Sequence, residues 1–164
     1  MRKLLLLALL SLLSCTSYAQ SDIHNTAPKW DYKISTDRMS DEKTQQCTIY
    51  AEQDFGLISG QPSLPKFSVL IEGNNLYVGL QVPNVEFCDP TDHFVNIRFD
   101  HDQPESYEYY FPVEGKKNTI ALKESTNLLA KLRKGKKMLV QARFILLGEK
   151  FIDFHTADFP IPEE

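Results

Sequence analysis

The feature that most constrains the fold is a pair of alternating runs in residues 67–82, FSVLIEGNNLYVGLQV. Side chains of a β-strand point alternately to the two faces of its sheet, so each run predicts a strand with one apolar face. Gly73 and Asn74 separate the runs and supply the positive φ angles that a tight hairpin needs. A turn at this pair sets Phe67 opposite Leu80 on the apolar face. We therefore expect an antiparallel hairpin at the centre of the domain.

Similar runs continue through most of the chain. The residues that predict further strands are 30–35, 43–51, 93–99, 107–113, 118–122, 138–147 and 150–155. In the first of these, Trp30, Tyr32 and Ile34 are expected to form an aromatic inner face. In the last two, a turn at Gly148 and Glu149 would set Leu146 opposite Phe151.

Helical spacing is predicted at one place only, about residues 126–134. A leucine stripe marks one side of this segment, Ser125 or Thr126 can cap its start, and Gly135 ends it. Strands and helices do not alternate, which argues against a parallel sheet. We expect a mainly β fold, an antiparallel β-sandwich or flattened barrel of about eight or nine strands with one short α-helix.

The N-terminus has the pattern of an export signal. Arg2 and Lys3 precede an apolar stretch at residues 4–13, and residues 17–19 form a small-x-small cleavage site. A stretch of ten residues is too short for a membrane span, which takes about 20. The pattern predicts a signal peptide at 1–19 and a periplasmic mature chain without a transmembrane segment.

Cys15 gives this segment a second interpretation. Residues 12–15, Leu-Leu-Ser-Cys, resemble a bacterial lipobox. In that case the signal would be residues 1–14, and Cys15 would be the lipidated first residue of a membrane-anchored lipoprotein.

The mature chain is one domain with a modest acidic excess. Residues 20–29 are polar and predict a flexible lead-in, and residues 30–164 are expected to form a single β-rich domain. The signal carries two of the 18 basic residues and none of the 22 acidic ones, so its removal changes the net charge from −4 to −6. Nucleic-acid binding is not expected, because it requires a basic excess.

Two cysteines remain after cleavage at the predicted site, Cys47 and Cys88. In an oxidising compartment an even number of cysteines predicts a disulfide. The alternative is a pair of buried free thiols.

Metal chemistry has one candidate, the turn Asp100, His101 and Asp102, with Asp89, Asp92 and His93 nearby in the sequence. Such ligands suit zinc or a hard cation, but neither a calcium-loop spacing nor His-x-x-x-His is present. Acidic residues are also common in turns for local reasons. The sequence has no Gly-x-Ser-x-Gly motif and no phosphate-binding glycine loop. We expect no metal, no other cofactor and no enzymatic activity.

The run of residues 107–111 is strongly aromatic. Tyr107 and Tyr109 share one face of the predicted strand and Tyr110 lies on the other. Exposed tyrosine suits a binding surface because its ring is rigid and amphipathic. These three residues are the candidate protein-binding surface, and ordinary packing in the core is the alternative.

Several stretches together resemble a known group of proteins. They are Trp30, DRMSD at 37–41, VNIRFD at 95–100, LLAKLRKG at 128–135 and a closing alternating strand. This layout resembles the small exported β-rich proteins that include the VasI-like accessory proteins of type VI secretion. The cysteine pair and the tyrosine run depart from it. The resemblance implies an exported, non-catalytic envelope protein.

The sequence thus favours a periplasmic binding or accessory protein that engages another macromolecule, such as a secretion component or an enzyme that it inhibits. A metal-assisted hydrolase using the turn at 100–102 is one alternative. A structural lipoprotein anchored through Cys15 is the other.

Overall fold

The computed structural model describes residues 29–58, 60–88, 93–123 and 125–161. In these residues nine strands form one antiparallel sheet in the order β1-β2-β5-β6-β9-β8-β7-β10-β11. Their bounds are β1 Asp31–Thr36, β2 Lys43–Tyr50, β5 Lys66–Glu72, β6 Asn75–Gln81, β7 Phe94–Phe99, β8 Glu105–Tyr110, β9 Thr119–Leu122, β10 Lys137–Phe144 and β11 Gly148–His155. A separate pair is formed by β3 (Leu57–Ile58) and β4 (Gln61–Pro62), and helix α1 spans Thr126–Lys134.

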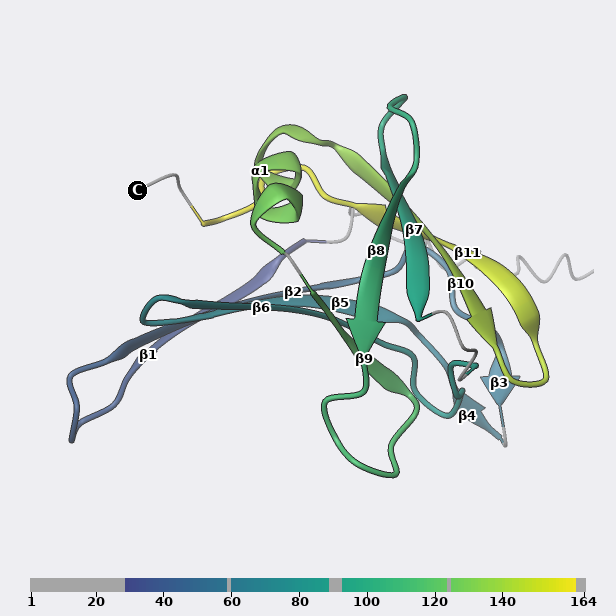
Figure 1. Ribbon diagram of the computed structural model, residues 1–164, viewed down its shortest axis with the longest axis horizontal. Coiled ribbons are helices and arrows are strands. Elements are labelled where there is room, and N and C mark those ends of the chain that lie inside the picture. The colour runs from purple at the N-terminus through teal and green to yellow at the C-terminus, as the bar shows by residue number, and fades with distance from the viewer. Residues whose placement is uncertain (1–28, 59, 89–92, 124, 162–164) are drawn as a thin grey trace, which may run out of the picture.

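The sheet bends over so that its two halves face each other (Figure 1). Strands β1, β2, β5 and β6 form one layer, and β8, β7, β10 and β11 cross above it as the second layer. The end strands β1 and β11 do not pair with each other in the described residues, so the sheet is not closed into a barrel. The predicted mainly β class and the helix are confirmed, but one continuous bent sheet replaces the separate sheets of a sandwich.

The space between the layers is the hydrophobic core. The rings of Phe67 from β5 and Phe154 from β11 lie 5.9 Å apart across the two layers. The rings of Phe87 and Phe144 lie 4.7 Å apart beside them. All four side chains are fully buried. Each such burial stabilises the fold by roughly 1.5–3 kcal/mol.

The central hairpin forms in the predicted register. Phe67 pairs with Leu80 and both are buried on the inner face. Gly73 turns the chain with φ +54°, a conformation that glycine adopts without steric cost. The inner faces of β5 and β6 therefore form the floor of the core.

The register predicted for the last hairpin is wrong. Phe144 pairs with Gly148 and Gln141 pairs with Phe151, so the turn lies at residues 145–147, before Gly148. Leu146, at the centre of this turn, has φ +69° and is 98% exposed. The observed register lets Val140 face Ile152, and both are buried.

The aromatic inner face predicted for the first strand is only partly formed. Trp30 is buried, its ring lies 5.0 Å from that of Phe159, and its Nε1 donates to the Thr156 carbonyl. Tyr32 and Ile34 are exposed. The reason is that the β1–β2 hairpin projects beyond the second layer (Figure 1), so nothing among the described residues covers its far end.

Helix α1 covers the open end of the core. Its leucine stripe is buried as predicted, comprising Leu128, Leu129 and Leu132. Ser125 does not cap the helix through its side chain, and its hydroxyl instead donates to the Leu122 carbonyl. A Cβ at Gly135 would lie 2.7 Å from the ring of Phe99. A glycine therefore lets the end of the helix approach β7.

The predicted disulfide between Cys47 and Cys88 is absent, and both residues are free cysteines. Cys47 is buried on the inner face of β2, in the first layer. Cys88 lies beside β10 of the second layer, where its amide donates to the Arg143 carbonyl. A disulfide needs the two Cα atoms within about 7 Å, and the even cysteine count carries no information on that distance.

Candidate binding surface

The tyrosine surface predicted at residues 107–110 is not formed by all three residues. Tyr107 and Tyr109 lie on the inner side of β8 and are buried. Their hydroxyls donate to the Glu105 carboxylate and the Cys88 carbonyl, respectively. Burial, together with the hydrogen bond to Glu105, raises the pKa of Tyr107. Only Tyr110, which points to the opposite side and is 40% exposed, is accessible to a partner.

Tyr110 shares the outer side of the sheet with two tyrosines that sequence analysis did not select. Tyr50 on β2 is 45% exposed and Tyr77 on β6 is 43% exposed. We use the name tyrosine face for the outward positions of β1, β2, β5, β6 and β9 together with Tyr110. The alternation of side chains along β2 and β6 indicates that both residues point outward, because Tyr50 follows buried Ile49 and Tyr77 precedes buried Val78.

Small residues separate the tyrosines of this face. Gly79 of β6 pairs with Ala121 of β9, which in turn pairs with Tyr110. Neighbouring strands lie about 4.8 Å apart, and successive residues of one strand are about 3.4 Å apart along it. Tyr77 and Tyr110 are two strands and two residues apart, which places their Cα atoms about 12 Å from each other. By the same spacing Tyr50 lies about 17 Å from Tyr77. The rings are therefore distributed over the face and do not form one cluster.

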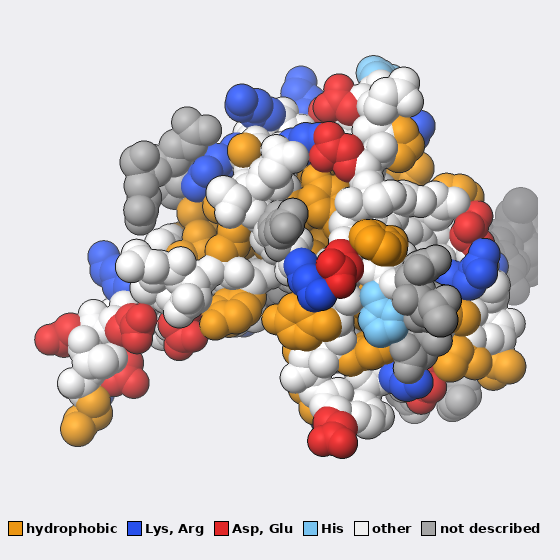
Figure 2. All heavy atoms as spheres, viewed as in Figure 1, with side chains coloured by type: hydrophobic (Ala, Val, Ile, Leu, Met, Phe, Trp, Pro, Cys, Tyr) orange, Lys and Arg blue, Asp and Glu red, His pale blue; other side chains and the backbone are white. Residues whose placement is uncertain are grey.

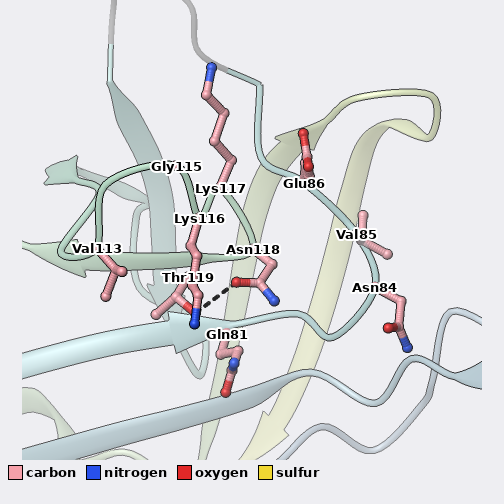
Figure 3. A pocket seen from close by; sticks show the side chains of 10 residues that line it. All are labelled: Gln81, Asn84, Val85, Glu86, Val113, Gly115, Lys116, Lys117, Asn118 and Thr119. Atoms are coloured by element: carbon pink, nitrogen blue, oxygen red, sulfur yellow. Dashed lines mark hydrogen bonds between the residues drawn. The ribbon is translucent and has the colours of Figure 1, made fainter.

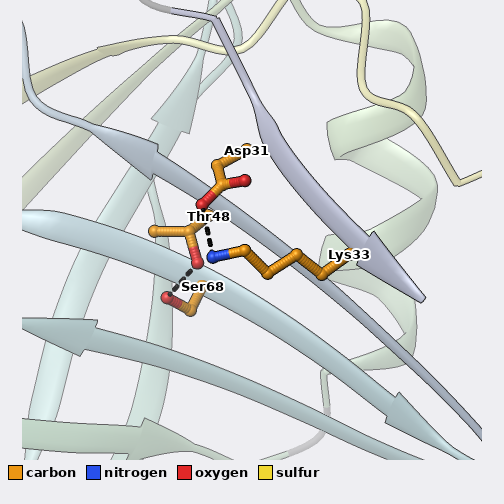
Figure 4. Close-up of polar contacts among 4 residues, drawn as sticks. All are labelled: Asp31, Lys33, Thr48 and Ser68. Atoms are coloured by element: carbon orange, nitrogen blue, oxygen red, sulfur yellow. Dashed lines mark hydrogen bonds and ion pairs between the residues drawn. The ribbon is translucent and has the colours of Figure 1, made fainter. Parts of the chain in front are cut away.

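The polar groups between the tyrosines are mostly uncharged hydroxyls and amides. The hydroxyls of Thr48 and Ser68 lie 3.1 Å apart in a hydrogen bond (Figure 4). At the β1 edge Lys33 Nζ lies 2.9 Å from Asp31 Oδ2, so these two charges pair with each other. This hydrogen bond raises the pKa of Lys33.

Net charge on the tyrosine face is zero. Its charged side chains in the described strands are Asp31, Lys33, Lys66 and Glu72, two of each sign. The whole chain, by contrast, has a net charge of −4. The acidic excess therefore lies elsewhere.

One end of the tyrosine face opens into a hollow of about 540 Å³ (Figure 3). Gln81 and Thr119 belong to both the face and the hollow. The connection at residues 111–118, which projects from the outer side of the sheet in Figure 1, supplies one wall. The Thr119 hydroxyl donates to Asn118 Oδ1 at 3.2 Å. Asn84, Glu86 and Lys116 also line this hollow, so its lining is largely polar.

A second hollow, of about 580 Å³, lies on the inner side between α1 and the projecting hairpins. Its lining includes the apolar residues Ile71, Leu76, Leu129 and Ile161. Figure 2 shows hydrophobic side chains at the surface below the helix. This hollow faces away from the tyrosine face.

The turn proposed for metal chemistry has a structural role. Asp100 has φ +45°, and its carboxylate accepts hydrogen bonds from the amides of Lys136 at 3.2 Å and Lys137 at 3.0 Å. These bonds fix the start of β10 after the helix. His101 and Asp102 are exposed. The described residues contain no group of three potential metal ligands.

His93 belongs to a different environment from this turn. Its ring stacks on that of Tyr109 with centroids 5.3 Å apart. Asp89 and Asp92, the other candidates, lie outside the described residues.

No protein-family model, curated protein or solved structure matches this chain. The resemblance to VasI-like accessory proteins therefore stays a prediction. Within the part of the chain that the structure describes, no helix is long and apolar enough to cross a membrane. The predicted signal at 1–19, Cys15 and most of the lead-in at 20–29 lie outside the described residues.

Proposed function

We propose that this protein is an exported, non-catalytic binding protein that engages another macromolecule through the tyrosine face. The observation that carries the proposal is the exposure of Tyr50, Tyr77 and Tyr110 on one side of the sheet. Exposed tyrosines suit binding because each provides a large amphipathic contact with few rotatable bonds. The signal pattern at residues 1–19 supports a periplasmic location.

The size of the face favours a macromolecular partner. Small ligands bind mostly in concave pockets that enclose them. The tyrosines instead lie on the open side of a sheet, with Tyr50 and Tyr77 about 17 Å apart by strand spacing. A ligand that contacts all three must extend over several strands.

Three of the reactive side chains in the described residues are buried or already paired, which supports the non-catalytic part of the proposal. Burial raises the pKa of the Cys47 thiol to about 12, so it is a poor nucleophile at neutral pH. The Asp100 carboxylate accepts backbone hydrogen bonds. Glu105 pairs with Lys131 of the helix.

The experiment compares the mature protein with two variants immobilised on a resin. Tyr77→Ser combined with Tyr110→Ser removes two rings of the face, and Tyr32→Ser is the matched control because Tyr32 is an exposed tyrosine on the inner side. Each resin is incubated with cell-envelope extract, and retained protein and carbohydrate are quantified. We expect a component that the wild type and the control retain and the double variant does not. Equal retention by all three proteins would contradict the proposal.

A further inference from the structure

We propose that the ligand of the tyrosine face is an uncharged polysaccharide chain. This inference rests on the proposed function and specifies the partner's chemistry. A pyranose ring has C–H groups that pack on an aromatic ring and hydroxyls that exchange hydrogen bonds with amides and hydroxyls. The tyrosine face offers both kinds of group, with Tyr77 and Tyr110 on either side of a strip of small and polar residues.

The charge of the face selects against charged polymers. Its two positive and two negative side chains sum to zero, and Asp31 and Lys33 pair with each other. A nucleic acid or an acidic polysaccharide would need a basic excess, and a basic peptide would need an acidic one. An uncharged ligand needs no excess of either charge on the surface that binds it.

Composition favours a sugar chain over a protein. The centre of a protein interface is usually apolar and contains clustered hot-spot residues. Among the outward positions of the described strands of this face, Leu70 is the only aliphatic side chain larger than alanine. The tyrosines are separated by Ser68, Gly79 and Ala121, which leave room for rings to lie between them.

Spacing favours a chain over a single sugar. Tyr77 and Tyr110 lie about 12 Å apart and Tyr50 about 17 Å from Tyr77 by strand geometry. One pyranose ring is too small to extend from Tyr50 to Tyr77. Beyond the tyrosines, Gln81 and Thr119 lead into the polar hollow of about 540 Å³, where Asn84 and Asn118 offer further amides. The hollow extends the same surface for the continuing chain.

Affinity electrophoresis tests this proposal. The mature protein migrates through native gels that contain hydroxyethylcellulose, glucomannan, xylan, dextran or pullulan, with polygalacturonate as the charged comparison. We expect at least one neutral polymer to retard the wild type, and Tyr77→Ala or Tyr110→Ala to weaken this binding about fivefold or more. Tyr32→Ala is expected to bind as the wild type does. Tyr77→Phe keeps the ring and should retain most of the binding, and matching melting temperatures show that the variants are folded.

Three results would overturn the inference. The first is that none of the five neutral polymers retards the wild type. The second is equal retardation of the wild type and the alanine variants. The third is stronger retardation by polygalacturonate than by any neutral polymer.

The retention experiment separates this failure from failure of the proposed function. If no neutral polymer binds but an envelope protein is retained by the wild type and lost in Tyr77→Ser with Tyr110→Ser, the function stands and the partner class is wrong. If no neutral polymer binds and the double variant retains the same envelope components as the wild type, the proposed function and the polysaccharide inference are both wrong.

Discussion

At the scale of residues, strand alternation decides which side chains a partner can reach. Tyr109 and Tyr110 are adjacent in the sequence, but the first is buried and the second exposed. This alternation could be predicted from the sequence, and it was correct for β8. Which side of β8 meets the core was not predicted, because tyrosines lie on both sides of this strand. The absence of the disulfide could not be predicted, because it depends on the separation of Cys47 and Cys88 in space.

The two thiols should differ in reactivity. Cys47 is buried with its thiol pKa raised to about 12, so we expect it to resist an alkylating reagent at pH 8 in the native protein. In denaturant without reductant, both Cys47 and Cys88 should be modified completely. Peptide mapping by mass spectrometry measures both states. Recovery of a peptide that joins Cys47 to Cys88 through a disulfide would show that our description is wrong.

Glu105 should make stability depend on pH. A hydrogen bond from Lys131, and then one from Tyr107, holds the pKa of Glu105 below its ordinary value. Because the pKa is lower in the folded state, this contribution to stability is present above the unfolded value of about 4.3 and is lost as the pH falls through the folded pKa. We expect Glu105→Gln to lower the free energy of unfolding at pH 7 and to differ less from wild type at pH 3. Urea denaturation at the two pH values measures the difference in the free energy of unfolding between wild type and variant. If this difference is the same at both pH values, the ion pair of Glu105 is not its cause.

At the scale of elements, local turn chemistry predicted one hairpin and failed for the other. Gly73 lies within the first turn with positive φ, as the sequence suggested, but Asn74 does not have the positive φ that was expected of it. In the last hairpin, Gly148 has φ +68° but is the first residue of β11, and Leu146 occupies the turn. A glycine with positive φ can lie within a turn or directly after it, so its position alone does not determine the register. Packing of Val140 against the core face decides between the two registers.

Leu146 offers a test of this turn. A leucine at φ +69° carries a steric cost of about 1–2 kcal/mol that glycine avoids, and its 98% exposed side chain has no packing to lose. After allowing for the larger entropy loss of glycine, we expect Leu146→Gly to raise the free energy of unfolding by roughly 0.5–1 kcal/mol. Ile145→Gly, at a neighbouring position without positive φ, should not stabilise. Equal effects of the two substitutions in urea denaturation would argue against the observed turn.

At the scale of the whole molecule, the β class was predictable but the order of the strands was not. β6 pairs with β9, and β7 lies between β8 and β10, so several pairings skip along the chain. Such long-range pairings cannot be predicted from the local periodicity of the sequence. The tyrosine face depends on them, because Tyr50, Tyr77 and Tyr110 come from three strands that are brought together only when the sheet forms. Of these three, sequence analysis selected only Tyr110, although the alternation along β2 and β6 also indicated Tyr50 and Tyr77.

Tyrosine footprinting in envelope extract tests most directly whether this face is the binding surface. The mature protein is exposed to hydroxyl radicals alone and in extract, and the modification of each tyrosine is quantified by mass spectrometry. In the free protein Tyr32, Tyr50, Tyr77 and Tyr110 should be modified, whereas Tyr107 and Tyr109 should be protected by burial. In extract we expect Tyr77 and Tyr110 to become protected and Tyr32, on the inner side, to react as before. Protection of Tyr32 with no change at Tyr77 and Tyr110 would contradict the account.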